Sequence, residues 1–119
     1  KLPESYLTRS SHKLEQALSE GMHKGITASC SGFYAPQGRV LRYQLARTDM
    51  IEKLNSFRHD EHKVTNFEME SSSLAGLSAM MGHRAMTVCC IIAGRVDKKM
   101  NTDYKESLPI LIDKVLNRI

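Results

Sequence analysis

The chain has 119 residues, of which 41% are hydrophobic and 25% are charged, a composition typical of one ordinary globular domain. Its longest apolar run, residues 88–93, is far too short to cross a bilayer, so the sequence excludes a membrane span there. The formal charge of +4 comes from cations interleaved with acids, whereas a nucleic-acid binder usually gathers its cations into one stripe. We therefore expect no membrane partner and no nucleic-acid partner.

The three cysteines, Cys30, Cys89 and Cys90, do not have the number or spacing of a disulfide framework. Two of them are adjacent in an apolar run, and buried reduced thiols are typical of cytoplasmic proteins. The first residues carry no long apolar core of a secretory signal. The sequence therefore predicts a cytoplasmic protein whose thiols pack in the interior and do not react.

Helices and strands alternate along the predicted chain. Capping residues indicate the helix starts, glycines indicate two helix ends, and apolar or β-branched runs indicate the strands. The predicted helices span approximately residues 10–20, 49–57, 74–81 and 103–119, and the predicted strands span residues 25–32, 64–69 and 85–93. This alternation favours an α/β fold in which helices cover a largely buried sheet.

Two of these elements carry strong apolar patterns. Residues 85–93 are apolar almost throughout, which predicts a central strand that is covered on both faces. The last helix has apolar residues at helical spacing from Leu108 to Ile119 and is predicted to be strongly amphipathic. Three strands make a narrow sheet, which is either complete in itself or half of a wider one.

The loop after the first predicted strand is the first candidate site. Ligands of open α/β sheets bind beyond the carboxyl ends of strands, and this loop offers the ring of Phe33, the amide of Gln37 and the guanidinium of Arg39. An amide presents a donor beside an acceptor and suits the edge of a pyrimidine, whereas a guanidinium suits a carbonyl that gains negative charge. The alternative interpretation is a surface turn in which both polar side chains are merely solvated.

The second candidate site is the sequence Glu68-Met69-Glu70, where a predicted strand passes into a helix. A carboxylate at this place can accept hydrogen bonds from two neighbouring hydroxyls of a sugar. The alternative is structural, because the exposed amides of a helix N-terminus also favour acids. Arg95 follows the predicted central strand, where it is either an ordinary exposed residue or an extension of the site around Arg39.

Two further patterns are weaker. His59 and His62 have a spacing compatible with a metal, but no third ligand is evident, which favours a solvated loop. Cys89 and Cys90 would point to opposite faces of a strand, so they cannot act together as a nucleophilic pair. Neither pattern indicates a site.

Taken together and in this order, the two main motifs resemble those of the bacterial uridine phosphorylases, within the nucleoside phosphorylase family whose members form trimers and hexamers. The resemblance rests on GFYAPQGR at residues 32–39, on NFEMES at residues 66–71 and on the apolar run that leads to Arg95. It implies a three-layer α/β/α fold with a mixed sheet. Residues 1–119 would be the C-terminal part of one nucleoside phosphorylase domain, without the N-terminal half that binds phosphate.

The resemblance also assigns roles to individual residues. The base-binding set that it implies is Phe33, Gln37, Arg39, Ile92 and Ala93, with Arg95 supporting Arg39. The ribose-binding set is Glu68, Met69 and Glu70. The residues expected to take part in catalysis are Arg39, Glu70 and Arg95, because they would stabilise charge on the leaving base and hold the sugar.

The implied activity is the phosphorolysis of uridine to uracil and ribose 1-phosphate in pyrimidine salvage, by a pentosyltransferase. Phosphate would be a co-substrate, with no metal and no organic cofactor, and the implied assembly is a homo-oligomer, specifically a hexamer. This chain by itself is expected to be inactive, because it lacks the family's phosphate-binding loop.

Some alternatives remain open. Ala35-Pro36 and Ala93-Gly94 depart from the family pattern, which leaves the pocket size and the tolerance for thymidine open. A purine-cleaving relative is disfavoured, since no acid follows the apolar run before Asp97. The remaining hypotheses are another phosphorylase or nucleosidase of the same superfamily, and a non-catalytic α/β interaction domain.

Overall fold

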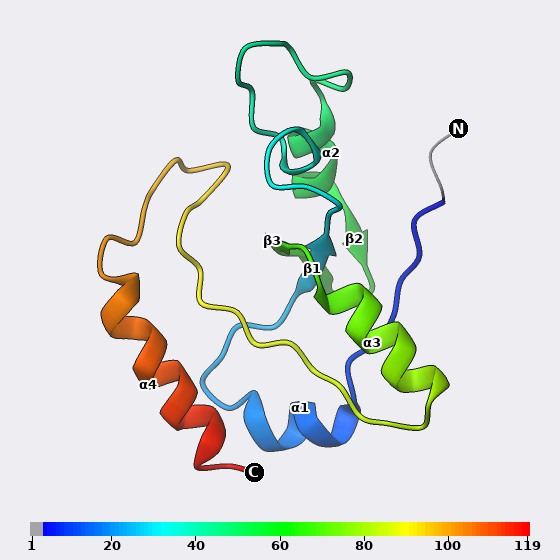
Figure 1. The fold of residues 1–119 in the computed structure, drawn as a ribbon, viewed down its shortest axis with the longest axis vertical. Coiled ribbons are helices and arrows are strands. Elements are labelled where there is room, and N and C mark those ends of the chain that lie inside the picture. Colours follow the sequence, from blue (N-terminus) through cyan, green and yellow to red (C-terminus); the bar gives the residue numbers. More distant parts are fainter. Residues whose placement is uncertain (1–3) are drawn as a thin grey trace.

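The computed structural model describes residues 4–119, which form four α-helices, one short 3-10 helix and three strands (Figure 1). The helices are α1 (His12–Leu18), α2 (Met50–Ser56), α3 (Ser71–Met80) and α4 (Tyr104–Leu116), and the 3-10 helix is η1 (Ala35–Gln37). The strands are β1 (Ile26–Ser29), β2 (Arg58–His59) and β3 (His62–Glu68). All four predicted helices and the first two predicted strands are thus confirmed.

Glycines end two of the helices as predicted. Gly21 follows α1 with φ of +67° and Gly82 follows α3 with φ of +74°, a left-handed conformation that glycine adopts without steric cost. Asp49 and Asp103 precede α2 and α4, but neither forms a side-chain capping hydrogen bond within residues 4–119. Their backbones are near-helical and not extended, so the caps that the sequence predicts at these two helix starts are wrong although the helix positions are right.

The sheet has the strand order β1–β3–β2. β1 runs parallel to β3 with Ser29 opposite Glu68, so the carboxyl ends of these two strands lie side by side. β2 pairs with β3 in an antiparallel hairpin whose turn contains Asp60 at φ of +53°. The predicted loop at residues 59–62 is therefore the exposed tip of this hairpin, and β2 is a strand that the sequence analysis missed.

Residues 85–93 do not form the predicted central strand. Among the described residues, the segment enters one isolated bridge, between Ala93 and Met100, and the Ala85 carbonyl accepts a hydrogen bond from the Ser11 amide at 2.8 Å. Figure 1 shows it as a long connection that runs between α3 and α4. A strand needs a neighbour that completes its backbone hydrogen bonds, and no strand of residues 4–119 pairs along this segment.

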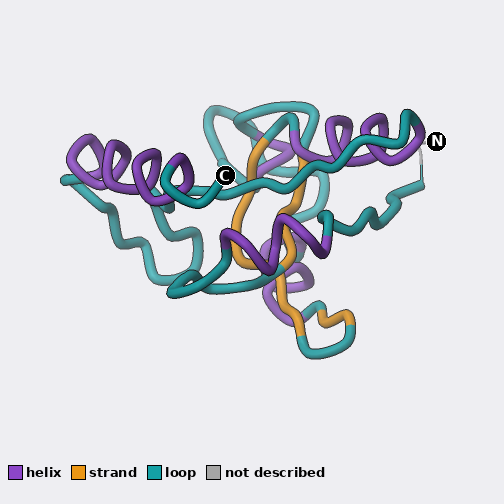
Figure 2. Tube along the Cα trace, turned by 90° about the horizontal axis from the view of Figure 1, so that it is seen from below, coloured by secondary structure: helices purple, strands orange, loops and turns teal. Residues whose placement is uncertain are grey.

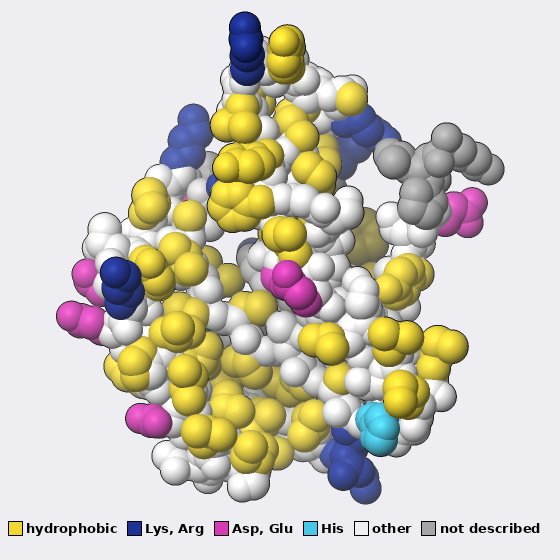
Figure 3. Space-filling view, in the orientation of Figure 1, with side chains coloured by type: hydrophobic (Ala, Val, Ile, Leu, Met, Phe, Trp, Pro, Cys, Tyr) yellow, Lys and Arg dark blue, Asp and Glu magenta, His cyan; other side chains and the backbone are white. Residues whose placement is uncertain are grey.

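Hydrophobic side chains are unusually exposed. Leu18 is the one hydrophobic residue that is buried within residues 4–119. The accessible surface is 9696 Å², whereas a compact protein of this mass exposes about 6,500 Å². The apolar stripe of α4 is not fully covered, since Ile112 is 48% and Leu116 57% exposed. Figure 3 shows hydrophobic side chains gathered over α4 and the neighbouring segments. Contiguous apolar patches are uncommon on soluble monomers.

Helices lie on both sides of the strands (Figure 2). α3 packs against β1, and α2 packs against β3. The end of α4 is joined to the end of α1 by Arg118, which donates hydrogen bonds to the carbonyls of Leu18 and Glu20 at 3.3 Å and pairs with the Glu20 carboxylate at 2.8 Å. None of the helices in residues 4–119 combines the length and the apolarity that a bilayer crossing needs.

A pair of glycine substitutions tests the turn that follows η1. Gly38 has φ of +74°, and a Cβ there would lie 2.5 Å from the Ile51 side chain, so we expect Gly38→Ala to cost about 1–2 kcal/mol of unfolding free energy. Gly76 is in the interior of α3 with open space around it, so Gly76→Ala should stabilise by up to about 1 kcal/mol. Urea unfolding of both variants measures these changes, and an unaffected Gly38→Ala would contradict the described turn.

Candidate functional site

The loop between β1 and α2 holds Gln37 and Arg39 in a defined arrangement. Pro36 lies in the first turn of η1, and the Tyr34 carbonyl accepts hydrogen bonds from the amides of Gln37 and Arg39 at 3.0 Å each. Gln37 is 4% exposed, although it is polar and lies in a loop. Its side-chain oxygen accepts a hydrogen bond from Nη1 of Arg39 at 2.7 Å. The interpretation of this loop as a solvated turn is therefore wrong for Gln37.

The Arg39 guanidinium also contacts Phe33. Its Nη1 also donates to the carbonyl of Phe33, and its Cζ lies 3.5 Å from the centroid of the Phe33 ring. This stacking is a cation–π contact. The ring of Tyr34 meets Phe33 edge-on at 5.3 Å. An aromatic face, an amide and a guanidinium are thus assembled within one short loop.

Arg95 acts on the charge of Arg39, although it lies 56 positions further along the sequence. Burial lowers the pKa of the Arg39 guanidinium, and the like charge of Arg95 lowers this pKa further. The Nε of Arg95 is buried and has no hydrogen-bond partner among the described residues. The charge of Arg95 thus acts on Arg39, and Arg95 keeps an unused donor. Two such cations favour an anion or a carbonyl oxygen that gains negative charge.

Glu68 ends β3 and binds the first turn of α3. Its Oε2 accepts hydrogen bonds from the backbone amides of Glu70 at 2.7 Å and Ser71 at 2.6 Å. Its Oε1 accepts hydrogen bonds from the hydroxyls of Ser29 and Ser71, the latter at 2.6 Å. Both carboxylate oxygens are therefore occupied, and the structural role that the sequence left open for this motif is present at Glu68.

These hydrogen bonds determine the ionisation of Glu68. Burial raises the pKa of its carboxyl group, but the hydrogen bonds from Ser29, Ser71 and the two backbone amides outweigh this effect and lower the pKa to about 2. Glu68 is therefore a carboxylate throughout the neutral and mildly acidic range.

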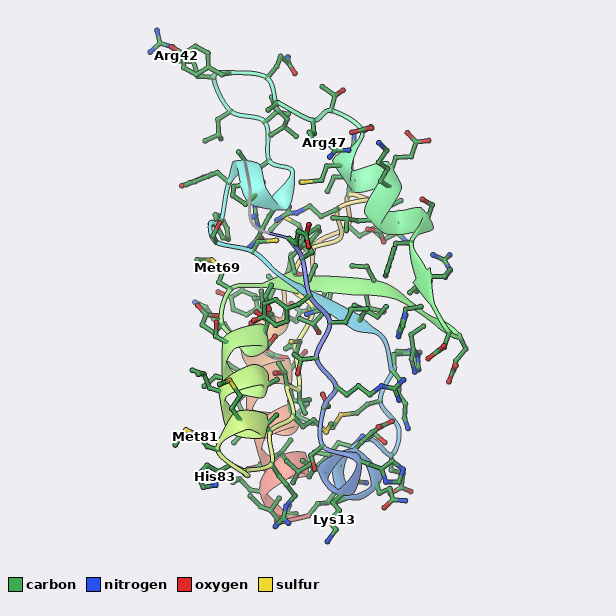
Figure 4. The ribbon with its side chains drawn as sticks, turned by 90° about the vertical axis from the view of Figure 1, so that its right-hand side faces the viewer. Lys13, Arg42, Arg47, Met69, Met81 and His83 are labelled. Atoms are coloured by element: carbon green, nitrogen blue, oxygen red, sulfur yellow. The ribbon has the colours of Figure 1, made fainter. Side chains whose placement is uncertain are left out.

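Glu70 differs from Glu68 in every respect. It is the residue immediately before α3, its side chain is exposed, and its carboxylate has no hydrogen bond or ion pair within residues 4–119. Met69, between the two acids, is 43% exposed and lies at the junction of β3 and α3 (Figure 4). The three residues thus present one fixed carboxylate, one apolar side chain and one free carboxylate.

Ile92 and Ala93 are exposed and precede Arg95 on the connection between α3 and α4. The Ile92 carbonyl accepts a hydrogen bond from the Asn101 amide at 2.7 Å, and the Gly94 amide donates to the Lys99 carbonyl at 2.8 Å. These bonds close a turn that carries Arg95. The assignment of Ile92 and Ala93 to the base-binding set remains a prediction.

Two hollows in the surface, of about 530 and 550 Å³, lie elsewhere. One is lined by Leu14 of α1 and residues 82–84, and the other lies between α3 and residues 6–8. Neither contains a predicted site residue. The loop that carries Gln37 and Arg39, and the segment from Glu68 to Glu70, lie instead at the carboxyl ends of β1 and β3.

The sequence analysis missed the residues that support this surface. Ser29 and Ser71 bind Glu68, and Thr27 donates a hydrogen bond to Asn66 at 2.9 Å across the same strand pair. A serine or threonine at the end of a strand does not by itself indicate a supporting role in a site. Its hydrogen-bond partner becomes evident only when the parallel register of β1 and β3 is known. The cysteines are free, as predicted, but half-buried, and burial raises the pKa of Cys30 and of Cys89.

The chain belongs to the Phosphorylase superfamily, since the sequence profile of this family matches residues 1–117. It is 42% identical over 89 residues to a uridine phosphorylase of Thermococcus kodakarensis, a match that covers 70% of this chain and 30% of the relative.

A solved structure is similar over a larger part of the chain. It is a nucleoside phosphorylase of Trypanosoma brucei, described as showing uridine phosphorylase activity, with a TM-score of 0.79 and 27% identity. The similarity covers 92% of this chain and 41% of that protein. The fold is therefore the α/β fold of a nucleoside phosphorylase, with a mixed sheet and helices, and the chain spans less than half the length of these two relatives.

The ionisation of Glu68 makes a prediction for stability. Because its folded pKa is about 2 and its ordinary value is 4.5, its contribution is complete above pH 4.5 and disappears as the pH falls toward 2. We expect this contribution to be about 2 kcal/mol. Urea unfolding at pH 7 and pH 3 should show a smaller pH dependence in Glu68→Gln than in the parent.

Glu70→Gln is the matched control, since this neighbouring carboxylate accepts no hydrogen bond from the described residues. It should keep the pH dependence of the parent. If the stability of Glu68→Gln depended on pH as strongly as that of the parent, this would contradict the stabilising role of the hydrogen-bonded Glu68 carboxylate.

Proposed function

We propose that this chain supplies the base- and ribose-recognition surface of an enzyme that cleaves uridine with phosphate, releasing uracil and ribose 1-phosphate. The observation that carries the proposal is the assembly of Phe33, Gln37 and Arg39 in one loop, with the charge of the distant Arg95 acting on Arg39. The family and the names of the two similar proteins support the same activity.

Uracil recognition follows from the chemistry of the loop. The Gln37 amide offers a donor and an acceptor to the N3–H and an adjoining carbonyl of the base, and Arg39 offers donors to a carbonyl. Phe33 is 51% exposed and provides an aromatic surface for the ring. Without a base, Arg39 covers one face of Phe33 and its Nη1 donates to Gln37. Binding of the base exchanges this internal hydrogen bond for hydrogen bonds to the base.

The ribose is assigned to the segment from Glu68 to Glu70. Glu70 is the free carboxylate of this segment and accepts hydrogen bonds from two sugar hydroxyls, while Met69 packs beneath the sugar. The carboxyl ends of β1 and β3 lie side by side in the parallel register. This places the base loop after β1 and the ribose segment after β3 at one edge of the sheet, as a nucleoside requires.

The reaction transfers ribose from nitrogen to oxygen. A phosphate oxygen attacks the anomeric carbon as the bond from this carbon to N1 of uracil breaks, and the bonding pair leaves with the base. Arg39 and Arg95 stabilise the negative charge that spreads onto the uracil carbonyl, so they bind the transition state more tightly than uridine. Glu70 holds the ribose while its ring flattens. The transfer needs no electron carrier, and the chain's own cations supply the charge stabilisation.

The phosphate site, on this proposal, lies outside this chain. The chain spans 30% and 41% of the lengths of its two relatives. It also leaves many hydrophobic side chains exposed, as expected of a segment that folds together with further residues. The functional enzyme is proposed to be a homo-oligomer, and this chain alone is proposed to be inactive.

The activity is tested with the full-length protein and uridine, in the presence and absence of phosphate. We expect uracil release that requires phosphate, measured by chromatography, and no release by residues 1–119 alone. Release without phosphate would indicate a nucleosidase, and cleavage of inosine but not of uridine would indicate a purine enzyme. Either result would contradict the proposal.

The base-reading residues are tested by Arg39→Ala and Gln37→Ala. Loss of a group that stabilises the leaving base should lower kcat/KM for uridine by about 100-fold in Arg39→Ala, and loss of one neutral hydrogen-bonding group by about tenfold in Gln37→Ala.

The matched control for these two variants is Arg42→Ala. Arg42 is a cation of the same loop, but it lies at the far tip of the loop (Figure 4), where its guanidinium is 5.9 Å from the ring of Tyr43. Its replacement should leave kcat/KM unchanged. Equal losses in all three variants would contradict the assignment of the base site.

A further inference from the structure

We infer that Ser29 is a positioning residue for ribose recognition, acting through Glu68 on the placement of Glu70. This inference rests on the proposed function. It concerns a hydroxyl at the end of β1 that belongs to neither the base-binding nor the ribose-binding set, and that lies at the junction of three elements.

Ser29 joins β1, β3 and α3 through one oxygen atom. In the parallel register it lies opposite Glu68, and its hydroxyl donates to Oε1 of this carboxylate. The same oxygen accepts a hydrogen bond from the backbone amide of Ser72 at 3.0 Å and lies 3.1 Å from the hydroxyl of Ser71. Ser29 therefore binds both the carboxylate and the helix turn that the carboxylate binds.

The placement of Glu70 depends on this arrangement. Oε2 of Glu68 accepts the backbone amide of Glu70 itself at 2.7 Å, together with the amide of Ser71. If the Glu68 carboxylate took another orientation, the two backbone amides that donate to it would shift with it. The Glu70 side chain has no partner of its own within residues 4–119, so the position of its backbone sets the region that its carboxylate can reach.

The burial of the participants supports a positioning role. Ser71 is 9% exposed, and Ser29 and Glu68 are half-buried, whereas Glu70 is exposed. Since both oxygens of Glu68 already accept hydrogen bonds from the protein, Glu68 would act on the sugar through Glu70. A buried support behind an exposed binding group is the arrangement expected of residues that orient a site.

The test compares Ser29→Ala with the parent, using the full-length protein. We expect kcat/KM for uridine to fall by about tenfold, because a charge-assisted hydrogen bond is lost. The inhibition constant of uracil should stay within about twofold of the parent, because uracil contacts the base loop and not Glu70. A general structural defect would weaken both, so the split between uridine and uracil identifies positioning.

Three further variants complete the experiment. Ser29→Thr keeps the hydroxyl on a residue that suits a strand and should recover most of the lost activity. Ser71→Ala removes the other hydroxyl donor to Glu68 while leaving β1 intact, and should show the same split if Ser29→Ala does not fold. Ser73→Ala alters an exposed serine of the same helix turn and should have no effect.

The outcomes separate this inference from the proposed function. A parent that releases no uracil from uridine overturns both. An active parent with unchanged uridine kinetics in Ser29→Ala and Ser71→Ala overturns the positioning role alone. Equal losses for uridine and uracil, without recovery in Ser29→Thr, overturn it as well.

Discussion

The carboxylate of Glu68 is the interaction on which the site depends. Glu68 is the last residue of β3. Its carboxylate accepts hydrogen bonds from two backbone amides at the start of α3 and from the hydroxyl of Ser29 in β1. One side chain thus joins two parallel strands to the helix that follows them. With few buried apolar side chains in the described residues, hydrogen bonds of this kind carry an unusual share of the local order. The low pKa of this group keeps the junction charged across the neutral range.

The parallel pairing of β1 with β3 relates structure to function. It places the loop with Gln37 and Arg39 beside the segment that ends in Glu70, and our proposal assigns the two parts of a nucleoside to this edge of the sheet. Arg95 joins the base side from a connection distant in sequence. On this proposal, catalysis depends on two arginines that stabilise charge and on Glu70, which holds the sugar. These roles require that the side chains are correctly positioned, and they do not require a reactive nucleophile.

Local patterns predicted the local features well. The four helices, the strands before Cys30 and Met69, and the family followed from apolar spacing, glycines and two short motifs. Pairing was not predictable in the same way, because apolar composition at residues 85–93 indicates burial but does not supply a neighbouring strand. The role of Ser29 was equally hidden, since a serine acquires its partner only from the strand register. The electrostatic effect of Arg95 on Arg39 is likewise a property of the fold.

A crystal structure of the full-length protein with uracil and ribose 1-phosphate tests the central claim most directly. The account predicts uracil within hydrogen-bond distance of the Gln37 amide and the Arg39 guanidinium, with the ribose hydroxyls on Glu70 and with Glu68 still bound to Ser29 and the α3 amides. Uracil bound away from the loop of residues 33–39, or a Glu70 carboxylate that does not contact the sugar, would contradict it.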